Sequence, residues 1–144
     1  MRLLRIAKSY MRQAKARLKD AEEALEELNY PYAVRLSQEC VELSLKAVLK
    51  AVGIEYPKVH DVSDVYLRIE GRLPNWFRAE IPFIRESSKI LVKKREISFY
   101  GGEEALLSPN DVIGEDDAKD AVIRARKVYN LCEKLINQLE RTKK

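Results

Sequence analysis

The chain has 144 residues, of which 46% are hydrophobic and 35% are charged, with a net charge of +4 and only five glycines and five prolines. This length predicts one domain over residues 1–144, the apolar fraction excludes an intrinsically disordered chain, and the few glycines and prolines argue against a turn-rich β-sandwich or barrel. The longest stretch without a charged residue, 28–34, is too short for a membrane span or for the apolar part of a signal peptide, so we expect a soluble cytoplasmic protein with no membrane partner.

The first predicted helix covers residues 4–28, because apolar side chains recur there at intervals of three and four positions. Its apolar stripe consists of Leu4, Ala7, Met11, Ala14, Leu18, Ala21, Leu25 and Leu28. Five basic residues follow the same rhythm on the adjoining side and form a cationic row: Arg5, Lys8, Arg12, Lys15 and Lys19. The cationic row could hold phosphate groups or could be a plain solvated helix face. We expect the helix to end before Pro31, because a proline disfavours a helical conformation at the residue before it.

Apolar residues cover a broad part of the second predicted helix, residues 32–52, which indicates a central position in the fold. On its polar side, Arg35 is spaced to pair with Glu39, and Glu42 with Lys46, and each such pair contributes about 0.2–0.5 kcal/mol. These side chains form either a solvated or interfacial face, or a polar groove that holds a ligand.

The sequence of the middle part of the chain predicts a short helix followed by a long one. The short helix is expected over residues 62–71, with Asp61 as its N-cap. The long helical stretch follows over residues 76–99, in which Pro82 either kinks the helix or marks a new first turn. Trp76 and Phe77, at the start of this stretch, are expected in the core or in a dimer contact rather than in a platform for base stacking.

The last helix is predicted over residues 116–140, after an acidic loop at 101–114. Since no alternating apolar run suits a strand, the predicted fold class is all-α: an antiparallel up-and-down bundle of four long helices plus a short helix. Cys40 and Cys132 lack metal-ligand spacing and are expected as buried thiols. We find no glycine-rich phosphate loop, HExxH segment or Cys/His cluster in the sequence, and we expect neither a metal nor a cofactor.

Residues 30–50, together with the loop that follows them, carry the most specific pattern in the chain. An aromatic and a small residue lead into a Gln-x-x-x-Glu-x-x-x-Lys-Ala helix, and a glycine and a Pro-x-x-His-Asp segment follow: Gln38, Glu42, Lys46 and Ala47, then Gly53, Pro57, His60 and Asp61. This pattern resembles the HEPN family (higher eukaryotes and prokaryotes nucleotide-binding domain), and the resemblance extends over roughly residues 7–139.

The resemblance implies a compact helical bundle that forms a homodimer through its long helices. It also implies a place in a toxin–antitoxin pair, because many small members of the family are encoded beside a minimal nucleotidyltransferase and form a complex with it. Active members are metal-independent RNases. Their site consists of an arginine followed, four to six residues later, by a histidine, and the two copies of this motif meet across the dimer interface.

This chain departs from the RNase motif at its decisive position. Arg95 is followed by four residues and then by Tyr100, while the only histidine is His60, in another predicted loop. Cleaving RNA through its 2′-hydroxyl requires a group that exchanges a proton near pH 7, as an imidazole does and a phenol of ordinary pKa about 10 does not. Arg95 can still neutralise a phosphate, and Tyr100 can stack on a base or donate a hydrogen bond. We therefore expect binding without hydrolysis.

Five residues are candidate ligand contacts: Arg95, Tyr100, His60, Arg35 and Lys46. Each also has a structural interpretation, such as a helix-end arginine, a tyrosine packed over the following glycine turn, or a histidine at a helix start. The leading hypothesis is a HEPN-type module that binds nucleotide, RNA or a nucleotidyltransferase and has no catalysis of its own. The alternatives are an RNase toxin with a degenerate Arg-x4-Tyr site, in which Tyr100 or His60 replaces the usual histidine, and a pure protein-interaction module.

Overall fold

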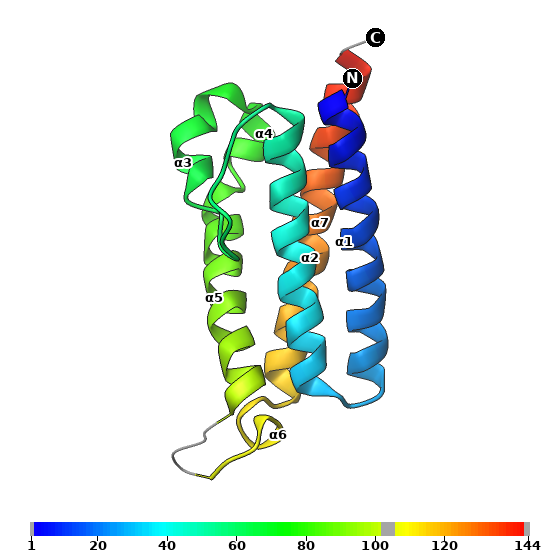
Figure 1. The fold of residues 1–144 in the computed structure, drawn as a ribbon, viewed down its shortest axis with the longest axis vertical. Helices are drawn as coiled ribbons and strands as arrows, with labels where there is room; N and C mark the ends of the chain where they lie inside the picture. The colour runs from blue at the N-terminus through cyan, green and yellow to red at the C-terminus, as the bar shows by residue number, and fades with distance from the viewer. Residues whose placement is uncertain (1, 102–105, 143–144) are drawn as a thin grey trace.

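The computed structural model describes residues 2–101 and 106–142, and every regular element in these ranges is helical (Figure 1). The predicted all-α fold class is thereby confirmed for this part of the chain. Four helices have 20 residues or more: α1 (Arg2–Glu26), α2 (Tyr30–Ala51), α5 (Ile81–Tyr100) and α7 (Glu115–Thr142). The short elements are α3 (Val65–Ile69), the 3-10 turn η1 (Glu70–Arg72), α4 (Asn75–Arg78) and α6 (Pro109–Val112).

The long helices alternate in direction along the chain, and α2 lies in the middle of the bundle (Figure 1). Helix α2 packs against α1, α5 and α7, which explains the breadth of its apolar surface. Alanines such as Ala7, Ala14 and Ala21 are fully buried on α1 and allow it to pack closely against its neighbours. The predicted central position of α2 is confirmed. No helix in the described ranges is both long enough and apolar enough to span a bilayer.

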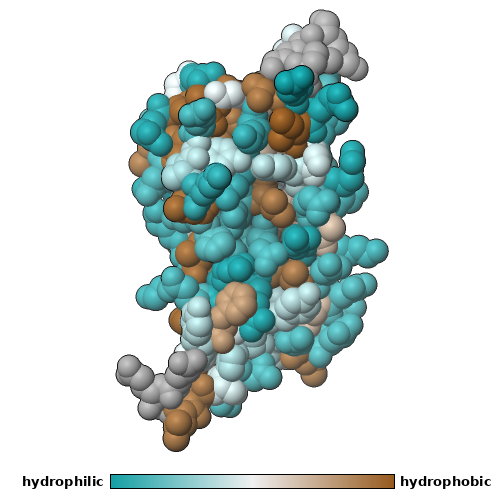
Figure 2. All heavy atoms as spheres, in the orientation of Figure 1, coloured by the Kyte–Doolittle hydropathy of each residue, from teal (hydrophilic) through white to brown (hydrophobic). Residues whose placement is uncertain are grey.

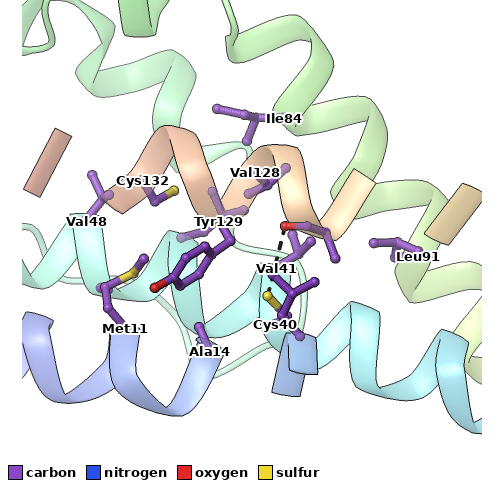
Figure 3. Close-up of a cluster of buried hydrophobic side chains, with 14 of the residues drawn as sticks. Met11, Ala14, Cys40, Val41, Val48, Ile84, Leu91, Val128, Tyr129 and Cys132 are labelled. Atoms are coloured by element: carbon purple, nitrogen blue, oxygen red, sulfur yellow. Dashed lines mark hydrogen bonds between the residues drawn. The ribbon is translucent and has the colours of Figure 1, made fainter. Parts of the chain in front are cut away.

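Figure 3 shows part of the core, where Met11 of α1, Cys40 of α2 and Cys132 of α7 lie together. Both cysteines are free and fully buried, as predicted. The Cys40 thiol donates a weak hydrogen bond of 4.0 Å to the Ala125 carbonyl. Burial raises the pKa of the Cys40 thiol to about 12, so neither redox nor nucleophilic chemistry is expected from it.

The turn between α1 and α2 differs from the prediction. Helix α1 ends at Glu26, and Leu28, predicted on the apolar stripe, adopts φ 62° and is 66% exposed. The Asn29 amide donates to the Ala24 carbonyl (2.8 Å), which closes the helix end. Helix α2 begins at Tyr30, two residues earlier than predicted, because Pro31 stands in the first turn, where its missing N–H costs nothing.

The predicted N-cap role of Asp61 is wrong. Helix α3 begins only at Val65, after Asp64. Asp61 instead accepts hydrogen bonds from the Ser63 amide (2.9 Å) and hydroxyl (2.6 Å), the Ser88 hydroxyl (2.7 Å) and the Lys89 ammonium (3.0 Å). The loop before α3 is thus fastened to α5 rather than to the helix that follows it.

The long helical stretch predicted from residue 76 is two helices. Helix α4 ends at Arg78, Ala79 and Glu80 form a turn, and Pro82 lies in the first turn of α5, so the second of the two alternatives is correct. At the other end of α5, Gly101 has φ 60°, and a Cβ there would lie 2.7 Å from the Leu107 carbonyl oxygen. Only glycine fits this approach, and Tyr100 is therefore the last residue of the helix.

The acidic loop predicted at 101–114 contains a short helix that sequence analysis missed. Helix α6 starts with a capping box, in which the Asp111 carboxylate accepts from the Ser108 amide (2.8 Å) and hydroxyl (2.9 Å). The acidic positions 103 and 104 lie outside the described residues. Helix α7 then begins at Glu115, with three carboxylates in its first turn.

Candidate functional site

The last two turns of α5 line a pocket of about 440 Å³. This Arg95 pocket is lined by His60, Val92, Arg95, Glu96, Phe99 and Tyr100. Three of the five candidate ligand contacts therefore share one pocket, although His60 is far from the other two in the sequence. The loop before α3 brings His60 to α5, and the Asp61 hydrogen bonds to Ser88 and Lys89 hold it there.

The Arg95 guanidinium uses only one of its nitrogens for the described part of the protein. Its Nη1 donates to Gln38 Oε1 (2.8 Å) and to Glu39 Oε2 (3.1 Å), both on α2. Within the described ranges, its Nε and Nη2 have no hydrogen-bond partner, and the side chain is 19% exposed. Two donors of a rigid fork thus remain for an anionic group.

An exposed aromatic ring, Phe99, contacts both arginines of the site. The guanidinium carbon of Arg35 lies 4.1 Å from the ring centroid, and that of Arg95 lies 5.0 Å from it. Such contacts attract a cation to the π-face of the ring. The Tyr100 ring lies next to Phe99, with centroids 6.3 Å apart, and is 65% exposed. The pair can present aromatic surface to a base beside two positive charges.

The predicted Arg35–Glu39 pair does not form between these two described side chains. Arg35 Nη2 donates to the Ser98 carbonyl (2.7 Å) and its Nε to the Ser98 hydroxyl (3.3 Å), so it holds the end of α5. Glu39 is occupied by Arg17 (2.8 Å) from α1 and by Arg95 (3.1 Å) from α5. This part of α2 is reached by cations from two other helices, and these displace the local pair.

Glu42 is the hub of the polar network on α2. It accepts from Gln38 Nε2 (3.0 Å) and Lys46 Nζ (2.7 Å), and it lies 2.7 Å from His60 Nδ1. Burial alone would raise the pKa of Glu42, but hydrogen bonds from Gln38, Lys46 and His60 outweigh burial and hold it below its ordinary value. An ionised carboxylate only accepts, so the Nδ1 of His60 carries a proton and donates it to Glu42.

Lys46, like Arg35, is a candidate contact that does not line the Arg95 pocket. The predicted Glu42–Lys46 pair forms, at 2.7 Å, and the ammonium lies 5.8 Å from the ring centroid of Tyr56. Lys46 binds the Glu42 carboxylate, which also binds His60, so Lys46 is connected to the Arg95 pocket only indirectly. Its positive charge balances the negative charge of Glu42.

Gln38 and Phe99 were not predicted as site residues, and Glu39 and Glu42 were predicted only as part of a possible polar groove, yet these four side chains position the candidate contacts. Gln38 joins Arg95 to Glu42, and Glu42 joins Gln38 to His60, so one chain of hydrogen bonds connects the guanidinium with the imidazole. The contact between Phe99 and Arg95 could have been predicted from the sequence, because Phe99 stands four positions after Arg95 on one helix face. No set of three or more His, Cys, Asp or Glu side chains in residues 2–101 and 106–142 is placed to hold a metal ion.

Comparison with known proteins identifies a family and a relative. A sequence model of the HEPN domain matches residues 7–135. The chain is 28% identical over 141 residues to a protein of Methanocaldococcus jannaschii named "Putative toxin MJ1304", covering 94% of this chain and 91% of that protein.

Two solved structures have the same fold. One is ST0689, described as an archaeal HEPN homologue, with a TM-score of 0.69, 25% identity, and coverage of 90% of this chain and 97% of that one. The other is TT1696 from Thermus thermophilus, with a TM-score of 0.72, 21% identity, and coverage of 89% and 96%. The second likeness shows the fold alone.

Proposed function

This chain belongs to the HEPN domain family, and we propose that it is a toxin-type member that binds RNA or a nucleotide at the Arg95 pocket without cleaving it. The resemblance seen in the sequence is thereby confirmed at the level of the family. The named toxin relative, similar over nearly the whole chain, supports a place in a toxin–antitoxin pair. We propose a minimal nucleotidyltransferase as the partner in that pair, since the family resemblance implies one.

The observation that carries this proposal is the free part of the Arg95 guanidinium beside an exposed aromatic pair. Nε and Nη2 of Arg95 are available to donate to two oxygens of one phosphate, while Gln38 and Glu39 hold the side chain in place. Phe99 and Tyr100 supply surface on which a base can stack, and Arg35 adds a second positive charge next to Phe99. Phosphate binding and base stacking together distinguish a nucleotide from a bare anion.

We expect the Arg95→Ala variant to bind a short single-stranded RNA about 10–100-fold more weakly than the unmodified protein. Charge-assisted hydrogen bonds contribute about 1.5–3 kcal/mol, and each 1.4 kcal/mol is tenfold in Kd. Fluorescence anisotropy of a labelled RNA measures the change. The matched control is Arg78→Ala, because Arg78 is an exposed arginine outside the Arg95 pocket that bonds to Asn75 of its own short helix, α4. Equal loss in both variants would contradict a role of the Arg95 pocket.

A second candidate function, RNA cleavage, is favoured by one specific observation. His60, oriented through Nδ1 by Glu42, lines the same pocket as Arg95, so the fold supplies the imidazole that the Arg-x4-Tyr segment lacks. In this mechanism His60 Nε2 takes the proton of a ribose 2′-hydroxyl, the 2′-oxygen bonds to phosphorus, and the 5′-oxygen leaves with a proton from water. Arg95 would neutralise the charge that develops on the phosphate.

The RNA recovered from the binding experiment also distinguishes binding without cleavage from RNA cleavage. With EDTA present, the leading proposal predicts intact RNA on a denaturing gel. Fragments ending in 2′,3′-cyclic phosphate that disappear with His60→Ala, and with a 2′-deoxy substitution in the substrate, would replace it with the second candidate. Glu42→Gln is the informative companion variant, since it keeps the size of the side chain that orients His60 but removes its charge.

We also propose that two copies of the chain associate at the end of the bundle where α5 stops. Five large hydrophobic side chains from the start of α2, the end of α5 and the segment after α5 are exposed: Tyr32, Phe99, Tyr100, Leu106 and Leu107. Figure 2 shows strongly apolar atoms, in brown, at the lower end of the molecule. Exposed apolar side chains that gather on one part of a surface are typical of an interaction site. A homodimer would bring two Arg95 pockets close together. We expect a molar mass of two chains in light scattering, and a reduction to one chain in Leu106→Glu; a one-chain mass for the unmodified protein would contradict the proposal.

A further inference from the structure

The cationic row on α1 is a second charged feature, separate from the Arg95 pocket. Its members, three or four positions apart, are all exposed, and they extend over about 21 Å of helix at 1.5 Å per residue. In this row, Lys8 is paired with Glu140 (2.6 Å). Among residues 2–101 and 106–142, no carboxylate lies within ion-pair distance of Arg5, Arg12, Lys15 or Lys19.

Most cations of α5 are paired, although Lys93 has no carboxylate within ion-pair distance in the described ranges. On α5, Arg85, Lys89, Lys94 and Arg95 each have a carboxylate within 3.1 Å. Residues 2–19 of α1 contain no acidic residue, and the acidic residues of the same helix begin only after the row, at Asp20. Four cations on one helix face without a carboxylate partner in the described ranges create a local positive potential that attracts a polyanion.

The row is held on a rigid support. The opposite side of α1 is buried against α2 and α7, with Leu4, Met11 and Leu18 in the core. Along its described length, α1 has no apolar face left to insert between lipid chains, as a membrane-surface helix requires. Beside the row, Arg2, Arg5 and Arg12 line a hollow of about 530 Å³ that also includes the Ser9 hydroxyl, so a phosphate can meet a hydrogen-bond donor there as well as charge.

We propose that the cationic row is a docking track for the phosphate backbone of an RNA strand. A strand with helical base stacking carries one phosphate per about 3.4 Å of axis, so about 21 Å of α1 faces at most roughly six phosphates. That the polyanion is RNA rests on the proposed function. That it is a strand of several phosphates rests on the length of the cationic row. Arg17, two positions from Lys15 and from Lys19, lies on a different side of α1 from the row and shares Glu39 with Arg95. The track and the Arg95 pocket are therefore separate surfaces, which variants can test one at a time.

The test replaces four cations of the row together: Arg5→Gln, Arg12→Gln, Lys15→Gln and Lys19→Gln. Glutamine is a good helix former, and these exposed side chains make no ion pair with the described part of the chain, so the variant is expected to fold. The matched control removes the same charge from exposed cations elsewhere: Lys58→Gln, Arg68→Gln, Arg78→Gln and Lys93→Gln. Anisotropy measures the binding of a labelled RNA of about 20 nucleotides at low and at physiological salt, about 50 to 200 mM.

For the row variant we expect at least about a tenfold rise in Kd at the lower salt concentration. The slope of log Kd against log salt should fall by about 3, because single-strand binding changes by about 0.7 per phosphate contact. A fall of similar size in the control would overturn the proposal, since only net charge would then matter. The proposal would also be overturned if the row variant bound RNA normally but no longer bound vesicles of phosphatidylserine and phosphatidylcholine. That result would indicate that the row binds a membrane surface.

The two proposals fail in distinguishable ways. If the row variant binds RNA as the unmodified protein does while Arg95→Ala weakens binding, the track is wrong and the proposed function stands. If the row variant loses binding while Arg95→Ala has no effect, the track stands and the Arg95 pocket is not the ligand site. A mononucleotide separates the two further, because it reaches the pocket but is too short to span the row.

Discussion

Replacement of Phe77 by alanine is expected to lower the free energy of unfolding by about 3–5 kcal/mol, the usual cost of a large cavity in a protein core. Phe77 is fully buried, with its ring centroid 6.0 Å from that of Tyr66 and 5.7 Å from that of Trp76. Its two ring neighbours attach α3 and α4 to the bundle, because the Tyr66 hydroxyl donates to the Leu45 carbonyl of α2 (2.5 Å) and Trp76 Nε1 donates to Gln138 Oε1 of α7 (2.9 Å). The side chain is thus a core contact, one of the two structural roles that the sequence predicted for it.

Urea denaturation followed by circular dichroism measures this loss, at one fixed protein concentration because association changes apparent stability. Phe77→Leu is the matched control and should cost about half as much or less, since leucine refills part of the cavity. Arg78→Ala, one position further on α4, should change stability by less than about 0.5 kcal/mol. A loss below about 1 kcal/mol in Phe77→Ala would show that α3 and α4 are not part of the cooperative core.

The second large effect is expected at Asp61. At neutral pH, Asp61→Ala should lower the free energy of unfolding by about 2–4 kcal/mol, because it leaves the buried Ser63 and Ser88 hydroxyls without their acceptor. Lys89 keeps Asp64 as a partner at 3.0 Å, which limits the loss. Asp61→Asn retains one acceptor oxygen and should cost about 1–2 kcal/mol. The same denaturation experiment measures both variants.

The carboxylate of Asp61 also predicts a pH dependence of stability. Burial would raise its pKa, but hydrogen bonds from Ser63, Ser88 and Lys89 lower it from the ordinary 3.8 to about 2. A depressed pKa in the folded state stabilises the fold above about pH 4, and this contribution disappears as the pH falls towards 2. With the side chain 22% exposed, we expect this contribution to be about 1–2 kcal/mol. Between about pH 5 and 2, the free energy of unfolding should fall less in Asp61→Asn than in the unmodified protein. Parallel plots of this free energy against pH would contradict the lowered pKa of Asp61.

The helices were predictable because the pattern that forms them is local. The apolar stripe from Leu4 to Leu25 lies every three or four residues and needs no knowledge of the partner helix. The helix ends were predicted less well. Asp61 is a suitable N-cap by residue type, but a carboxylate that can reach Ser88 and Lys89 on another helix finds more hydrogen bonds there than at the start of α3.

Pairing among the polar residues of α2 shows the same contrast. The Glu42–Lys46 pair follows from spacing along one helix and is present. The Arg35–Glu39 pair has the same spacing but does not form between these described residues, because Arg17 and Arg95 approach Glu39 from other helices. Spacing along a helix determines which side chains can meet, while the neighbouring helices determine which of them do.

The amino-acid sequence by itself was sufficient for the all-helical class, the central place of α2, the buried thiols and the family, since each depends on residue type and short-range spacing. The pocket shared by His60, Arg95 and Tyr100 was decided only by the tertiary structure. It requires the loop before α3 to fold back on α5, and the hydrogen bonds that hold the loop there join residues more than twenty positions apart. Such contacts form only when the bundle has assembled, because the entropy of closing so long a loop is offset by the packing of the whole core.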